Sequence, residues 1–293
     1  MMEPIFKNIS IIGLGLIGTS ILHAIRAQKN QEIITYAYDI NSKHRDAVLE
    51  MGIANFVCDN IHNAVKEADL VILAIPVGSM KILASSISPS LKEGAIVTDT
   101  GSTKNSVIED VNPFIPKNVI FIPSHPLAGT EYSGPKAGFG SLFENRYWLI
   151  ICEKETSHTK NLTIFFQNLG SVVETVSAEY HDKILAITSH LPHLIAYTIV
   201  GTASDLETDL KNDVIKYSAS GFRDFTRIAA SDPIMWRDVF LNNTEAILEM
   251  LQRFNEDLSD LQKAIRKKQG KKLHTFFSRT RSIRRRIIEA GQD

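Results

Sequence analysis

The stretch that decides the fold of the first half is Asn8-Ile-Ser-Ile-Ile-Gly13-Leu-Gly15-Leu-Ile-Gly18. A short apolar run typical of a β-strand leads into three glycines, and a helical pattern, Leu16–Gln28, begins among them. Each glycine has its own task in such a turn. Gly13 permits the tight turn, Gly15 lets a pyrophosphate approach the backbone, and Gly18 lets the helix pack close to the sheet. The spacing predicts a strand–turn–helix unit whose helix N-terminus binds a dinucleotide.

A carboxylate at the end of the next predicted strand supports this interpretation. Asp39 stands twenty-one residues after Gly18, where it can accept hydrogen bonds from ribose hydroxyls. It would repel a 2′-phosphate, so NAD is favoured over NADP. The alternative is that Asp39 only forms a turn before Asn41 and Ser42. Ligands bind at the carboxyl ends of parallel strands, so the predicted cofactor contacts are Gly13, Leu14, Gly15, Leu16, Ile17, Gly18, Asp39, Ala74, Pro76, Gly101 and Ser102.

Strand-like runs alternate with helical patterns over the first 176 residues, which is typical of βαβ units and a parallel sheet. Near Ser177 the alternation stops and the remaining sequence has only helical patterns. We therefore expect an α/β domain at 1–177, a Rossmann-type doubly wound sheet, followed by an all-α dimerisation domain at 178–293. The predicted strands are Asn8–Ile12, Ile33–Tyr38, Leu70–Ile75, Ile96–Asp99, Val119–Pro123, Tyr147–Cys152 and Val172–Val176. The predicted helices are Leu16–Gln28, Ser42–Met51, Met80–Leu91, Ala178–Thr202, Thr208–Tyr217, Pro233–Ala264 and Lys271–Glu289.

Composition narrows the class of protein. Of 293 residues 44% are hydrophobic and 22% charged, and the only cysteines are Cys58 and Cys152. So few cysteines argue against a disulfide scaffold, and no Cys/His spacing suggests a zinc site or any other metal site. No signal peptide and no apolar stretch of membrane-spanning length is apparent. The expectation is a soluble cytoplasmic protein without a membrane partner.

The charge distribution is uneven. From Leu261 to Ile288 there are eleven Lys or Arg and no acidic residue. A nucleic-acid site is one interpretation, but Gln262–His274 has no aromatic residue to stack on bases. We expect a solvated helical face instead.

Two distant stretches carry groups suited to chemistry: Ser-His-Pro-Leu-Ala-Gly-Thr-Glu at 124–131 and Gly-Phe-Arg-Asp-Phe-Thr-Arg at 221–227. His125, expected on a Pro/Gly-rich loop, can exchange a proton near neutral pH. Arg223 and Arg227 can bind a carboxylate through paired hydrogen bonds. The alternatives are a loop histidine bonded to backbone and an arginine cluster in a salt bridge with Asp224. Together with a dinucleotide site, the stretches indicate hydride chemistry on a small carboxylated substrate.

With these stretches assembled, the chain resembles the prephenate/arogenate (cyclohexadienyl) dehydrogenases of tyrosine biosynthesis. The resemblance rests on the glycine turn with Asp39 and on the blocks at 99–104, 124–134, 190–193, 221–227 and 231–236. One departure is Ser218-Ala-Ser-Gly221, where many relatives have successive glycines.

The resemblance implies an NAD-dependent oxidative decarboxylation of prephenate to 4-hydroxyphenylpyruvate, or of arogenate to tyrosine. It makes His125 the catalytic residue, accepting the hydrogen bond of the substrate hydroxyl, and places Arg227 on the ring carboxylate. Prephenate is preferred because His193 could donate to a keto acid, although Glu131 could attract an amine. The implied substrate contacts are Ser102, Thr130, Glu131, His193, Gly221, Asp224, Arg227 and Trp236.

Two other functions stay open at this point. A β-hydroxyacid-type dehydrogenase would use a lysine of the helical half, for which Lys183 is the nearest candidate, and a non-catalytic protein would bind NAD without turnover. The apolar spacing in Val239–Leu261 also predicts a homodimer formed by the helical half.

Overall fold

The structure is a computed structural model that describes residues 4–28, 32–205 and 216–289. The chain divides into two compact units, Met1–Thr244 and Glu245–Asp293. The predicted helix at Thr208–Tyr217 lies almost wholly outside the described residues. The domain boundary between 177 and 178 stays a prediction, because the helices up to Thr244 belong to the same compact unit as the sheets.

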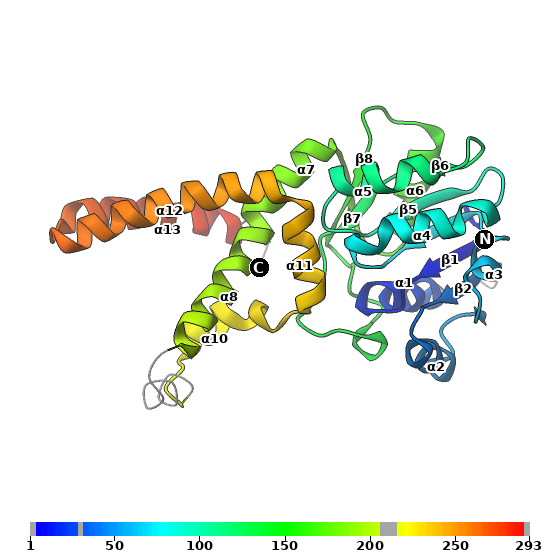
Figure 1. Cartoon of the computed structure of the whole chain (residues 1–293), viewed down its shortest axis with the longest axis horizontal. Helices are drawn as coiled ribbons and strands as arrows, with labels where there is room; N and C mark the ends of the chain where they lie inside the picture. Colours follow the sequence, from blue (N-terminus) through cyan, green and yellow to red (C-terminus); the bar gives the residue numbers. More distant parts are fainter. Residues whose placement is uncertain (1–3, 29–31, 206–215, 290–293) are drawn as a thin grey trace. The chain divides into compact units, whose positions relative to one another are not determined.

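A six-stranded parallel sheet forms the centre of the first unit (Figure 1). Its strand order, β3-β2-β1-β4-β5-β6, is that of the Rossmann fold. The order reverses between β1 and β4, and such switch points are where ligands bind. The strands are β1 (Asn8–Ile12), β2 (Ile34–Tyr38), β3 (Phe56–Val57), β4 (Leu70–Leu73), β5 (Ile96–Asp99) and β6 (Ile120–Phe121).

Helices cover both faces of this sheet, as the alternating side chains of β4 demonstrate. Leu70 and Ile72 pack into one hydrophobic core together with α1 and α6. Val71 and Leu73 pack into a second core with α3, α4 and α5. The predicted doubly wound sheet is therefore confirmed. The helices are α1 (Leu16–Ala27), α2 (Ser42–Met51), α3 (Ile61–Val65), α4 (Met80–Ile87), α5 (Asn105–Val111) and α6 (Ser157–Asn168).

A second sheet of three strands was not anticipated. It contains β7 (Ser124–Pro126), β8 (Tyr147–Ile151) and β9 (Val172–Val176), with β7 antiparallel to β8. The sequence predicted β8 and β9 but placed them in the parallel sheet, and it placed His125 in a loop. Prolines at 123 and 126 bound β7, and these residues favour turns and strand edges, so the pattern predicted no strand there.

The helices after residue 177 are more divided than predicted. The first run contains α7 (Ala178–Leu185), a π-helical segment (Ala186–His190) and α8 (Leu191–Ser204), so regular α-helical bonding is interrupted just before Pro192. The predicted helix Pro233–Ala264 is two helices, α11 (Pro233–Asn242) and α12 (Thr244–Arg266). They separate at Asn243, whose side chain donates to the carbonyl of Asp182. Between α8 and α11 lie α10 (Ser220–Thr226) and a 3₁₀ turn, Arg227–Ala230.

The second unit consists of α12 from Glu245 onward and α13 (Gly270–Glu289). Both helices expose large apolar side chains, including Leu248, Leu258 and Ile265 on α12 and Phe277 on α13. The many basic residues of α13 are exposed, and the packing of this face against the acidic body or a partner subunit stays a prediction.

One helical run among the described residues, Ala178–Ser204, is long and apolar enough to cross a membrane by length and composition. The expectation that no apolar stretch reaches membrane-spanning length is therefore wrong for this run. This run carries His181 and Asp182, which hydrogen-bond to β7 and to the start of α5. Such hydrogen bonds are typical of a helix that packs within a folded unit.

Candidate functional site

The glycine-rich turn between β1 and α1 gives Gly13 and Gly18 the steric roles that the sequence predicted, and it leaves open space at Gly15. Gly13 has a left-handed φ of 98°, and a β-carbon there would overlap the Ala74 carbonyl. A β-carbon on Gly18 would overlap the Gly13 carbonyl. Gly15 is different: it lies at the N-cap of α1, no side chain caps the helix, and nothing lies within 4 Å of the added atom. This open helix N-terminus fits a pyrophosphate group.

The open space at Gly15, in contrast to the crowded positions of Gly13 and Gly18, allows the predicted pyrophosphate contact to be tested by mutation. Gly15→Ala should change the free energy of unfolding by less than about 1 kcal/mol, because only the N-cap preference changes. The added methyl group would occupy the space of the pyrophosphate, so the Kd for NAD should rise by about tenfold or more, or about 1.4 kcal/mol. Calorimetric titration with NAD measures the effect. Gly270→Ala, at another open helix start, is the control. Unchanged NAD affinity in Gly15→Ala would place the dinucleotide elsewhere.

Asp39 follows β2 and ties the second strand to the glycine turn. Its carboxylate accepts from the backbone N–H of Leu14 at 2.7 Å and from that of Asn41 at 2.8 Å. His44 Nδ1 lies 3.1 Å from the same group. Asp39 therefore does form a turn, and the two hydrogen bonds hold its carboxylate at the edge of the sheet beside the glycines. The predicted contacts Ala74, Pro76, Gly101 and Ser102 lie at the same edge, since they follow the adjacent strands β4 and β5.

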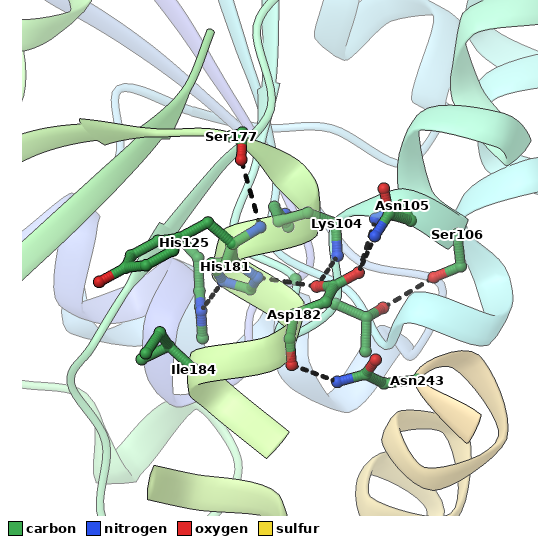
Figure 2. Close-up of polar contacts among 12 residues, drawn as sticks. Lys104, Asn105, Ser106, His125, Ser177, His181, Asp182, Ile184 and Asn243 are labelled. Carbon is green, nitrogen blue, oxygen red and sulfur yellow. Dashed lines mark hydrogen bonds and ion pairs between the residues drawn. The ribbon is translucent and has the colours of Figure 1, made fainter. Parts of the chain in front are cut away.

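The catalytic candidate His125 is the first member of a buried chain of three side chains (Figure 2). Its Nδ1 lies 2.9 Å from Nε2 of His181, and Nδ1 of His181 lies 2.8 Å from Oδ1 of Asp182. His125 is 8% exposed, His181 0% and Asp182 3%. His125 comes from β7 and the other two from α7, so the chain of bonds joins the second sheet to the first C-terminal helix.

Asp182 is fixed by the start of α5. The backbone N–H groups of Lys104 and Asn105 donate to its two carboxylate oxygens at 2.8 and 2.9 Å, and the Asn105 amide donates at 2.8 Å. Burial alone would raise the pKa of Asp182, but the hydrogen bonds from His181, Asn105 and Lys104 outweigh it and lower that pKa. The carboxylate is therefore ionised and accepts hydrogen bonds only.

A buried ion pair lies next to Ser124, the residue that precedes His125. The Lys104 ammonium contacts the Asp99 carboxylate and donates to the Ser124 carbonyl at 2.8 Å. Ser124 also receives a hydrogen bond from the indole of Trp148 at 3.0 Å. These bonds join the end of β5 to the start of β7, so they determine where the His125 ring lies.

Charge and burial keep His125 neutral. Desolvation lowers its pKa well below the usual 6.5, and His181, Lys104 and His190 lower it further. Burial also lowers the pKa of His190 to about 4. The neutral ring is the form that can accept a proton, but the lowered pKa makes it a weaker base than the expected histidine that exchanges a proton near neutral pH.

A second cluster contains the predicted substrate contacts. Arg227 Nη1 donates to Oε2 of Glu131 at 2.7 Å, and it pairs with that residue rather than with Asp224. His193 stacks on Trp236 with ring centroids 3.5 Å apart, and its Nδ1 donates to the Ser189 carbonyl at 2.8 Å. In neutral His193 the free Nε2 is then an acceptor, so donating to a keto acid requires a protonated ring.

The two clusters influence each other electrostatically. Arg227 lowers the pKa of His193, His193 that of His190, and His190 that of His125, in each case after the larger effect of burial. These charge effects connect the two clusters stepwise through His193 and His190. The remaining predicted contacts, Thr130, Gly221 and Asp224, are exposed.

The sequence analysis missed His181, Asp182 and Asn243, and it gave Lys104 no role. Neighbouring helix positions such as His181 and Asp182 point in directions about 100° apart, so the pair showed no face pattern. Ser177 before them gave only a helix-start signal, and its side chain does accept from the Tyr180 N–H. The rival Lys183 is exposed and pairs with Glu179 at 2.8 Å, away from the buried chain.

Comparisons with known proteins identify the family of this chain. The model for the prephenate dehydrogenase nucleotide-binding domain matches residues 22–178, and the model for the prephenate dehydrogenase dimerization domain matches residues 177–279. The chain is 41% identical to the cyclohexadienyl dehydrogenase of Zymomonas mobilis, covering 96% of both chains. It is 34% identical to the prephenate dehydrogenase of Lactococcus lactis, covering 95% of this chain and 77% of the relative.

Similar structures give the same result. The prephenate dehydrogenase of A. aeolicus, crystallised in complex with hydroxyphenyl propionate and NAD⁺, superposes with a TM-score of 0.86. Its sequence is 32% identical, and the match covers 96% of this chain and 98% of the other. With both halves matched and relatives above 30% identity along nearly the whole chain, the protein belongs to the prephenate dehydrogenase family.

Proposed function

We propose that this oxidoreductase catalyses the NAD-dependent oxidative decarboxylation of prephenate to 4-hydroxyphenylpyruvate. The observation that carries the proposal is the buried bond of His125 to His181, which occupies Nδ1 and leaves Nε2 as the base. The glycine turn, Asp39 and an arginine clamp complete the requirements of the reaction.

Bound NAD supplies the hydride acceptor. The chain's own residues then have three tasks. His125 accepts the hydrogen bond, and then the proton, of the substrate hydroxyl as negative charge leaves the ring carbon. Arg227 binds the ring carboxylate, which is subsequently lost as CO₂ and leaves an aromatic ring. The side chains that position the substrate are Ser102, Thr130, Glu131, His193, Asp224 and Trp236, together with the backbone at Gly221.

The preference for NAD over NADP rests on Asp39. Its carboxylate lies at the end of β2 and is fixed by the Leu14 and Asn41 N–H groups, so it cannot turn away from a ribose phosphate without losing both bonds. The NAD⁺ present in the A. aeolicus relative supports the same cofactor here.

Arogenate is the second candidate substrate, and two observations favour it. The neutral form of His193 offers a hydrogen-bond acceptor, and Glu131, which pairs with Arg227, adds a carboxylate to the predicted substrate contacts. Both suit an ammonium group better than a keto oxygen. The 41% identical relative from Zymomonas mobilis is a cyclohexadienyl dehydrogenase, a name that covers both substrates.

Steady-state kinetics measured in parallel with prephenate and with arogenate show which substrate is preferred. With NAD in excess, we expect both compounds to be oxidised, as followed by NADH absorbance. The larger kcat/KM is expected for prephenate, because the similar proteins from Lactococcus lactis and A. aeolicus are prephenate dehydrogenases. A larger kcat/KM for arogenate would reverse the preference. Turnover of neither compound would contradict the proposed function, and turnover of a β-hydroxyacid would favour the rival class.

We also propose a homodimer formed through the helical half, consistent with the matched dimerization domain. Two residues of the predicted apolar spacing, Val239 and Ile247, are buried already, whereas Leu248 and Leu258 are 56% and 53% exposed. A second chain would cover these exposed side chains. Analytical ultracentrifugation at micromolar concentration should give twice the chain mass, and Leu258→Glu should shift the distribution toward monomer. A monomeric wild type contradicts the proposal.

A further inference from the structure

Next to His125, the buried chain of hydrogen bonds contains two further ionisable side chains to which the proposed function gives no role. His181 and Asp182 continue the line of hydrogen bonds from His125 inward and end at the N-terminus of α5 (Figure 2). We propose that Asp182 and His181 form a closed proton relay that stores the substrate's hydroxyl proton during oxidation and returns it to the same oxygen. The inference deepens the proposed function and rests on it.

The direction of each bond follows from Asp182. Its carboxylate is surrounded by donors from Lys104, Asn105 and His181 and can only accept. His181 therefore carries its proton on Nδ1, which leaves a lone pair on Nε2. That lone pair faces His125, so His125 carries its proton on Nδ1 too. Its Nε2 is consequently free to act as the base.

The proton balance of the proposed reaction explains why the relay can be closed. The substrate dianion loses a hydride to the cofactor and a molecule of CO₂, which leaves a monoanion and releases no net proton. The hydroxyl proton is needed again, because the ring oxygen becomes a phenolate when CO₂ leaves and must be reprotonated. The protein therefore needs only to hold this proton until CO₂ has left, and no path for protons to solvent is required. The burial of all three side chains, each at most 8% exposed, fits a store.

In this arrangement, the positive charge produced by the proton transfer can be stabilised by the Asp182 carboxylate. When His125 accepts the hydroxyl proton on Nε2, it can pass its Nδ1 proton to Nε2 of His181, 2.9 Å away. The positive charge then lies 2.8 Å from the Asp182 carboxylate instead of on His125. The other ionisable groups that influence His125 and His181 are Lys104, Asp99 and His190, and the Lys104 charge is paired with Asp99. Reversal of both transfers reprotonates the phenolate.

The first test uses the unmodified protein and does not depend on turnover. In ¹⁵N-histidine NMR, neutral His125 and His181 should both show the Nδ1–H tautomer, whereas free neutral histidine favours Nε2–H. Assignment comes from the loss of one signal set in His125→Asn and in His181→Gln. An Nε2–H tautomer at either residue breaks the line of donors and overturns the relay. Because no substrate is present, this result stands apart from any failure of the proposed function.

The second test separates positioning from proton storage. Gln at position 181 can still accept the His125 Nδ1–H through its amide oxygen, but it cannot take a proton. His181→Gln should lower the single-turnover rate of NADH formation by about 10- to 100-fold, part of what a positioned proton acceptor contributes. KM and the Kd for NAD should stay within twofold. In H₂O/D₂O mixtures, the rate should vary nonlinearly with deuterium content in the wild type and linearly in the variant.

Two results would contradict proton storage by His181. One is a single-turnover rate of His181→Gln within threefold of the wild type. The other is a nonlinear deuterium dependence that persists in the variant. His274→Gln, at an exposed position of α13, is the matched control and should leave all these values unchanged. If His181→Gln does not fold, as judged by thermal unfolding, His125→Asn still assigns the His125 signals, and the tautomer of His125 in the wild type decides.

Discussion

His125→Asn is expected to lower kcat by about 10²- to 10⁴-fold, the usual contribution of a positioned general base. Asparagine can keep the bond to His181, because its amide N–H occupies the place of Nδ1, but it has no counterpart to Nε2. KM should change little, since the lost interaction develops only as the hydride leaves. Steady-state kinetics on the preferred substrate, with NADH absorbance as the signal, measures both parameters.

The pH profile supplies a second measure of the same residue. Burial lowers the pKa of His125 well below 6.5, and the neutral form is the active one. The wild-type kcat should therefore be level from neutral pH down to pH 6.5 and fall only at lower pH, through the lowered pKa. His274→Asn, at the exposed position in α13, is the control and should behave as wild type. Near-normal kcat in His125→Asn would make this histidine structural and refute the mechanism.

Arg227→Ala should chiefly raise KM. The guanidinium would bind a carboxylate that is present in both the ground state and the transition state, so its loss weakens both alike. A charged partner left unpaired in a closed site costs about 2–5 kcal/mol, which is on the order of 30- to several-thousand-fold in KM. The arginine is 56% exposed without substrate, so the protein should fold normally. Affinity for NAD should be unchanged.

Arg223→Ala is the matched control, because Arg223 lies one turn earlier in α10 and is also exposed. It should keep both kcat and KM. Glu131→Gln removes the carboxylate that holds Arg227 and should change KM by much less than Arg227→Ala. A lower kcat at constant KM in Arg227→Ala would show that the arginine acts on the transition state alone and would contradict the carboxylate clamp.

The cofactor half was predictable because its signals are local. Strand β1, the three glycines and α1 are contiguous, and the steric demands on Gly13 and Gly18 arise from neighbours that any βα turn supplies. The same holds for β4, whose four side chains are all buried between two layers of helices. Such patterns of apolar residues and glycines need no knowledge of the rest of the chain.

The centre of the site was less predictable because its bonds join distant residues. Asp182 binds Lys104 and Asn105, which precede it by nearly eighty positions, and His125 binds His181 across two elements. Even the break at Asn243 depends on Asp182 and His190. The sequence shows that these residue types are present, but only the packing of α7 against α5 and β7 determines which of them meet.

The π-helical segment 186–190 has a consequence for the history of this chain. The Leu191 N–H donates to the carbonyl of Ala186, five residues earlier, so the turn contains one residue more than an α-helical turn. Loss of any one residue there would restore a continuous α-helix and leave the residues beyond it facing nearly the same way, because the wider turn is what accommodates the extra residue. His181 and Asp182 precede the segment and His193 follows it. A one-codon deletion at the exposed Thr188 should thus leave an unbroken α-helix with His193 still facing Trp236, so single-residue gaps between homologous sequences are expected in this segment.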